Sequence, residues 1–102
     1  MEKLVYDYPA GGSAARRVLV GVVGSGDLEV LLAPNAPGAT SIVIHTSVHG
    51  MAKVWKALLT RIFTTTLLPA AKIEINDCGA TPGVVRMRLE QAFEALHEPD
   101  RK

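Results

Sequence analysis

The sequence lacks the features of secreted and membrane proteins. Its single cysteine, Cys78, cannot form an intramolecular disulfide. No charged segment followed by an apolar run opens the chain, as a secretion signal would require. Gly, Pro or a charged residue interrupts every apolar run before it reaches the roughly 20 residues of a membrane-spanning helix. We therefore expect a cytoplasmic protein that does not insert into a membrane.

The chain also lacks an excess of either charge. It has 11 Lys and Arg residues against 10 Asp and Glu, for a formal net charge of +1. Domains that bind nucleic acid usually carry a surplus of cations, because they must neutralise the phosphate backbone. The composition therefore argues against a nucleic-acid partner.

The size and hydrophobicity of the chain indicate a single folded module. With 102 residues it can build one core, but a substrate domain beside a cofactor domain would not fit. Hydrophobic residues make up 48% and charged residues 21%, a balance typical of globular rather than disordered chains. We expect one domain over residues 1–102, with flexible tails at residues 1–14 and 98–102.

Apolar, β-branched runs dominate the first half of the chain. Two of them, at residues 17–23 and 28–33, are separated by Gly-Ser-Gly-Asp at residues 24–27, a break of hairpin length. Residues 34–38 combine Pro, Asn and Gly and mark a turn before a third run at residues 41–46. The first half is therefore interpreted as an N-terminal β-meander.

The second half changes to a helical spacing. Apolar residues recur every three or four positions over residues 51–63, which predicts one amphipathic helix. A fourth strand is predicted at residues 72–75. Thr81 and Pro82 suit the N-cap and first position of a second helix that reaches about residue 97. The order β-β-β-α-β-α predicts an α+β fold, a two-layer α/β sandwich.

Ser25 is the residue whose setting points most directly to chemistry. It lies between two glycines at the tip of the predicted hairpin, where no neighbouring Cβ would shield its hydroxyl. Such a serine suits covalent modification, because the modifying enzyme supplies the activation and the chain need only present the hydroxyl. The same four residues are also favourable for a hairpin turn alone, and the motif does not separate the two interpretations.

A second candidate is the segment at residues 76–83, between the fourth strand and the second helix. Free backbone N–H groups at a helix start, together with the helix dipole, favour an anion such as a phosphate or a partner's carboxylate. The alternative is a turn followed by an ordinary N-cap. Arg86 and Arg88 on the helix could likewise meet phosphates or an acidic partner, although exposed helical arginines are most often solvated.

The other chemically active side chains give weaker signals. Cys78 would need His45 or His49 beside it to act as a thiol nucleophile, and the sequence does not place them together. The two histidines are four apart across a strand end, a spacing that does not put both rings on one face, so no metal site is expected. Trp55 falls in the apolar helical stripe and is expected in the core.

Three segments taken together resemble the delta subunit of malonate decarboxylase, an acyl carrier protein. They are residues 20–31 (VGVVGSGDLEVL), Thr46-Ser47-Val48 with Trp55 after it, and residues 73–85 (IEINDCGATPGVV), so the resemblance covers about residues 17–96. More distantly, the Ser-Gly-Asp hairpin and the Asn-Asp-x-Gly-Ala segment are similar to the gamma subunit of citrate lyase. Cys78 departs from the family pattern, in which we expect a bulkier apolar or aromatic residue.

The resemblance implies that Ser25 is joined through a phosphodiester to phosphoribosyl-dephospho-coenzyme A, whose thiol carries acetyl or malonyl as a thioester. The implied function is that of a non-catalytic carrier, with no catalytic residue and no metal of its own. The implied partners are an acyl-transferase subunit that exchanges acetyl for malonyl and a subunit that decarboxylates malonyl. A prosthetic-group transferase and a malonyl transferase complete the expected set.

Two other functions stay open from the residues alone. The chain could be an unmodified structural or docking subunit that uses the hairpin only for contacts, or a small cysteine hydrolase built on Cys78. The three hypotheses respond differently to mutation. Ser25→Ala should abolish only a carrier function, whereas Cys78→Ala should abolish only a hydrolase.

Overall fold

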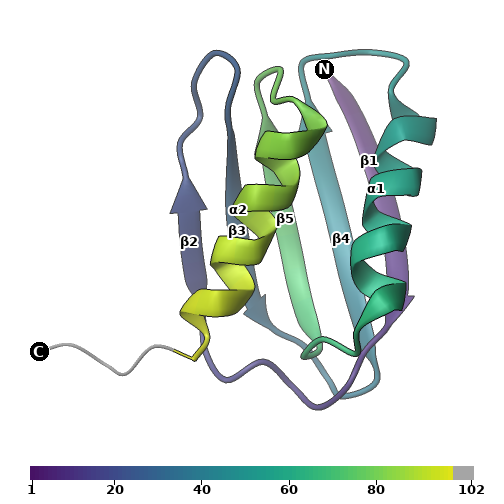
Figure 1. Ribbon diagram of the computed structural model, residues 1–102, viewed down its shortest axis with the longest axis vertical. Helices are drawn as coiled ribbons and strands as arrows, with labels where there is room; N and C mark the ends of the chain where they lie inside the picture. The colour runs from purple at the N-terminus through teal and green to yellow at the C-terminus, as the bar shows by residue number, and fades with distance from the viewer. Residues whose placement is uncertain (98–102) are drawn as a thin grey trace, which may run out of the picture.

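The protein is a two-layer α+β sandwich in which two helices cover one face of a five-stranded sheet (Figure 1). A computed structural model describes residues 1–97, so the tail predicted at residues 98–102 lies outside the described residues. The elements are β1 (Glu2–Pro9), β2 (Val18–Gly21), β3 (Leu28–Pro34), β4 (Ala39–Thr46), α1 (Ala52–Thr65), β5 (Ala71–Asp77) and α2 (Pro82–Ala95). The predicted fold class is confirmed.

Strand β1 is one difference from the sequence prediction. A flexible tail over residues 1–14 is wrong for residues 2–9, because β1 pairs antiparallel with β4 along its whole length. Leu4, Tyr6 and Tyr8 pack against the core, while the residues between them are exposed. Leu4, Tyr6 and Tyr8 share one side of the strand, but the apolar Val5 lies on the other side, so the sequence shows no clean alternation of apolar and polar residues. The side that carries the tyrosines becomes buried only when β4 and α1 are beside it.

The position of β5 is the other difference. The strands lie in the order β1-β4-β5-β3-β2, so the predicted hairpin of β2 and β3 is confirmed, but the meander does not continue into β4. Instead β5 separates β3 from β4, antiparallel to the first and parallel to the second. The cause is α1, because a strand–helix–strand connection returns the chain in its original direction and brings β5 alongside β4.

The core lies between the sheet and the two helices. Helix α1 buries Trp55, Leu59 and Phe63, and α2 buries Val85, Leu89, Ala92 and Phe93. The ring of Phe63 stacks on Tyr8 at a centroid distance of 5.4 Å and meets the edge of Phe93 at 5.8 Å, which joins both helices to the first strand. Trp55 is 5% exposed, so its predicted core position is confirmed.

Three chain connections lie at the same end of the molecule. Figure 1 shows the β2–β3 hairpin tip, the β4–α1 connection and the β5–α2 loop together at the upper end of the view. The opposite face of the sheet carries no helix in the part of the chain that the structure describes. No helix within residues 1–97 is long and apolar enough to span a membrane.

Candidate functional site

Ser25 occupies the second position of a tight turn at the hairpin tip. The N–H of Asp27 donates to the carbonyl of Gly24 at 3.0 Å, and Gly26 has a φ of 75° while Ser25 has a negative φ. These angles are typical of a type II turn, which requires a residue that tolerates positive φ at its third position. The sequence Gly-Ser-Gly-Asp therefore forms a turn that places Ser25 where the chain reverses.

The surroundings of Ser25 are open. The residue is exposed, as predicted, and within residues 1–97 its hydroxyl has no hydrogen-bond partner. A Cβ added at Gly26 would have nothing within 4 Å, and one added at Gly24 would meet only a Val22 methyl at 4.0 Å. A group attached at the Ser25 hydroxyl would therefore displace no neighbouring side chain.

The β5–α2 loop holds this turn from the side. The N–H of Gly26 donates to the Cys78 carbonyl at 2.8 Å, and the N–H of Cys78 donates to the Asp27 carbonyl at 2.9 Å. These bonds continue the ladder between β3 and β5 beyond its last pair, Leu28 and Asp77. The structure thus brings together two segments that are separate candidates in the sequence.

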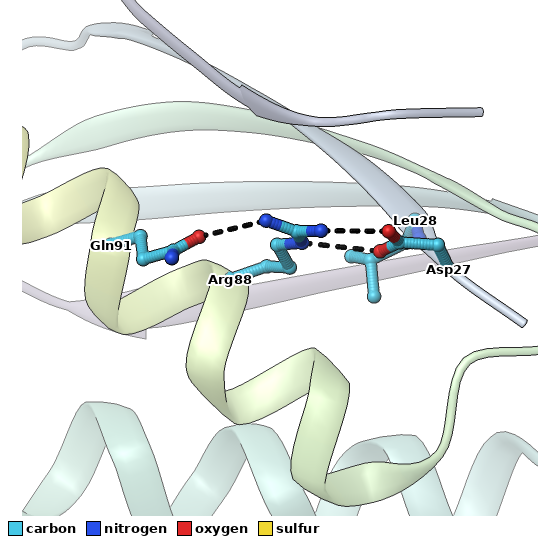
Figure 2. A network of polar contacts seen from close by, with 4 residues as sticks. All are labelled: Asp27, Leu28, Arg88 and Gln91. Atoms are coloured by element: carbon cyan, nitrogen blue, oxygen red, sulfur yellow. Dashed lines mark hydrogen bonds and ion pairs between the residues drawn. The ribbon is translucent and has the colours of Figure 1, made fainter. Parts of the chain in front are cut away.

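An ion pair also holds the turn at Asp27 (Figure 2). Arg88 of α2 reaches Asp27 with two hydrogen bonds, Nη2 to Oδ2 at 2.7 Å and Nε to Oδ1 at 3.1 Å. Oδ1 also accepts the N–H of Leu28 at 2.7 Å, and Arg88 Nη1 donates to Gln91 at 3.1 Å. Each side chain is less than a quarter exposed, at 22% for Asp27 and 23% for Arg88. The two hydrogen bonds of this bidentate pair fix the orientation of the Asp27 carboxylate relative to Arg88, in addition to the attraction between the charges.

The hydrogen bonds from Arg88, and then that from the Leu28 N–H, hold the pKa of Asp27 below its ordinary value. The sequence indicated Arg88 as a phosphate-binding or solvated residue and did not reveal this pair. Asp27 and Arg88 are 61 positions apart, and no local pattern links them. Arg86 differs, because it is exposed and only approaches Glu90 at 3.9 Å.

At the end of β2 nearest the turn, the backbones of β2 and β3 approach each other closely at Gly21. This residue has a φ of 81°, and a Cβ there would lie 2.1 Å from the Leu28 carbonyl oxygen and 3.3 Å from Cδ of Arg88. Only glycine fits that position, since any side chain would meet backbone as well as adopt a strained φ. Gly21 therefore sets the path by which the chain enters the Ser25 turn.

The segment at residues 76–83 is a turn followed by an N-cap. Thr81 Oγ1 accepts the N–H of Val84 at 3.3 Å, which confirms the predicted cap of α2. The Asp77 carboxylate accepts the N–H of Ala80 at 2.9 Å and the hydroxyl of Thr46 at 2.8 Å, and the residue is only 4% exposed. The N–H groups of Cys78 and Ala80 in this segment are already engaged, as is that of Val84 just after it, and the buried Asp77 carboxylate lies beside them. The segment offers little to an additional anion.

The remaining candidates are not assembled into a site. His45 Nε2 lies 3.2 Å from Glu74 on the helix-free face of the sheet. No hydrogen bond joins the Cys78 thiol to a histidine within the described residues. The same residues contain no group of three His, Cys, Asp or Glu side chains placed to hold a metal. The hydrolase hypothesis therefore gains no geometric support.

Replacing Asp27 by asparagine is expected to lower the free energy of unfolding at neutral pH but not in acid. The pKa of Asp27 is lower in the folded chain than its ordinary value of 3.8, so its contribution is present above that value. That contribution is lost as the pH falls through the folded-state pKa. Urea unfolding of both proteins, in steps from neutral pH to about pH 2, measures the difference.

The matched control is Asp7→Asn, which removes an exposed carboxylate on β1 that has no ion pair within residues 1–97. Its stability should follow that of the unmodified sequence at every pH. If Asp27→Asn lost the same stability at all pH values, the charge of the carboxylate would not be the cause.

Comparisons with known proteins agree on one family. The family model for the malonate decarboxylase delta subunit matches residues 15–96. The malonate decarboxylase acyl carrier protein of Pseudomonas aeruginosa strain PAO1 is 57% identical, over 92% of this chain and 95% of its own length. The protein of the same name from Pseudomonas syringae pv. syringae strain B728a is also 57% identical, over 94% and 97%.

A solved structure is similar as well. It is a chain in the crystal structure of a Pseudomonas malonate decarboxylase hetero-tetramer in complex with malonate. That chain is 55% identical to this one, with a TM-score of 0.92, and the match covers 94% of this chain and 99% of that one.

Proposed function

Because this chain belongs to the family of malonate decarboxylase delta subunits, we propose that its Ser25 is the attachment point of a covalent phosphoribosyl-dephospho-coenzyme A arm. The observation that carries the proposal is the Ser25 turn, whose hydroxyl has no partner within residues 1–97 and open space on both flanks. A phosphodiester at Ser25 Oγ is compatible with these surroundings. Once attached, the arm supplies a thiol on which acyl groups travel as thioesters.

The residues around Ser25 contribute geometry to this function. Cys78 holds the turn through two backbone hydrogen bonds and Arg88 holds it through Asp27, so the arm starts from a fixed point. A tether with a fixed origin raises the effective concentration of its free end at any active site within reach, to about the millimolar range for short linkers. The carrier thus contributes delivery, and the bond-making chemistry belongs to its partners.

The partners in this proposal are the subunits that use the arm. The similar solved chain is part of a hetero-tetramer, which supports a carrier that works inside a complex. We assign to that complex an acyl-transferase subunit that exchanges acetyl for malonyl and a subunit that decarboxylates malonyl. A prosthetic-group transferase would attach the arm, a malonyl transferase would load it, and both steps would take place in the cytoplasm.

The intact mass of the chain tests this function. After co-expression with the transferase and the triphosphoribosyl-dephospho-coenzyme A synthase, the mass is expected to rise by that of the arm. Fragmentation should then place the addition on the peptide that contains Ser25. An unmodified chain, produced beside enzymes shown to act on another carrier of the family, would refute the proposal. It would also make an unmodified docking subunit the leading hypothesis.

A further inference from the structure

A hydrophobic pocket of about 270 Å³ lies between the beginnings of α1 and α2. One part of its lining comes from residues 48–58 of the β4–α1 connection and α1, the other from residues 77–85 of the β5–α2 loop and α2. We call it the interhelix pocket. The connections that line it lie at the same end of the molecule as the hairpin tip (Figure 1).

The interhelix pocket and the Ser25 turn share one strand end. Asp77 and Gly79 line the pocket, and Cys78 between them makes the two backbone hydrogen bonds that hold the turn. The loop that forms this wall of the pocket is therefore bonded to Gly26 and Asp27, the two residues that follow the exposed serine. A tether that starts at Ser25 therefore starts at the same end of the molecule as this pocket, with the β5–α2 loop between them.

The lining of the pocket is apolar and partly uncovered. Two apolar side chains of the lining are open to solvent, because Val48 is 39% exposed and Val54 is 41% exposed. Asp77 and Thr81 are the polar side chains of the lining, and both already accept hydrogen bonds from backbone N–H groups of the chain. The surface left for a ligand therefore suits a small, neutral, apolar group.

We propose that Val48, Val54 and Trp55 shelter the thioester end of the arm whenever the carrier is not engaged by a partner; this inference rests on the proposed function. The volume of the pocket equals that of about nine water molecules at roughly 30 Å³ each, enough for an acetyl thioester and its adjoining ethylene group. Because the ligand is tethered at an effective concentration of about millimolar, even a weak intrinsic affinity populates the sheltered state.

Trp55 is the direct reporter of occupancy, because it lines the pocket and is the single tryptophan of the chain. Its indole N–H gives one cross-peak in a nitrogen–proton NMR spectrum and needs no further assignment. Loading the chain with the acetylated arm is expected to shift this cross-peak from its position in the unloaded chain. The same comparison in Val54→Asp should give a much smaller shift, since a carboxylate at the mouth opposes an apolar ligand.

A second readout is the rate at which hydroxylamine cleaves the acetyl thioester of the loaded arm, which releases the acetyl group as its hydroxamate and leaves the free thiol, followed by intact mass. Cleavage is expected to be about two- to ten-fold faster in Val54→Asp than in the unsubstituted pocket. Val5→Asp is the matched control, because Val5 is 58% exposed on β1 and lies outside the pocket lining. Val48→Asp gives an independent second variant should Val54→Asp fold poorly.

The outcomes separate the two proposals. A chain that acquires no arm overturns both the proposed function and the shelter. A loaded chain whose Trp55 cross-peak stays at its unloaded position, with equal rates of thioester cleavage in all variants, overturns the shelter and leaves the carrier function standing.

Discussion

Ser25→Ala is expected to remain folded and to acquire no arm at all under conditions in which the unsubstituted chain is fully loaded. The substitution removes the oxygen that would form the phosphodiester, and no described residue hydrogen-bonds that oxygen. The free energy of unfolding should therefore change by no more than about 0.5 kcal/mol, as at other exposed sites. Intact mass and urea unfolding measured on the same sample check both parts.

Ser47→Ala is the control for this experiment. Ser47 is an exposed serine in the β4–α1 connection, at the same end of the molecule as Ser25. It lies outside the hairpin turn and should be dispensable, so Ser47→Ala is expected to load like the unsubstituted chain. An arm found on Ser25→Ala would show that the transferase accepts another residue, and loss of loading in both variants would point to a general defect of recognition.

Gly21→Ala is expected to lower the free energy of unfolding more than alanine at any other positive-φ glycine of the described chain. The added Cβ would lie 2.1 Å from the Leu28 carbonyl oxygen, so the two strands of the hairpin must separate, and the φ of 81° is unfavourable for alanine as well. Strain and overpacking together should cost roughly 3 kcal/mol or more. A shift of the urea midpoint at unchanged slope would measure this cost.

Gly50→Ala isolates the steric part of that effect. Gly50 has the same φ of 81°, but an added Cβ there would have nothing within 4 Å. Its substitution should therefore cost only the backbone term, about 1–2 kcal/mol. Equal losses for Gly21→Ala and Gly50→Ala would mean that the hairpin base relaxes freely and does not depend on the close approach at Gly21.

The features that could be predicted from the sequence are those encoded by neighbouring residues. The β2–β3 hairpin follows from the glycines that flank Ser25, and the start of α2 follows from Thr81 as its N-cap, because both signals act within four residues. The exposure of Ser25 has the same local origin. These elements can therefore be predicted without knowing which distant segments they contact.

The features that were missed depend on pairing between distant segments. β1 becomes a strand only through its pairing with β4, and β5 takes its place between β3 and β4 only after α1 has reversed the chain. The supports of the Ser25 turn have the same character, since Arg88 lies 61 positions after Asp27. Local patterns could therefore identify the serine but not the residues that hold it.

The supports of the Ser25 turn also make its rigidity depend on the last third of the chain. Cys78 and Arg88 both belong to the last third of the chain, so during synthesis the serine emerges long before the residues that fix it. A nascent or truncated chain presents Ser25 on an unsupported loop, and only a chain that has formed β5 and α2 presents it on a rigid one. Under the proposed function, a transferase that recognises the rigid form would modify only chains in which β5 and α2 have folded.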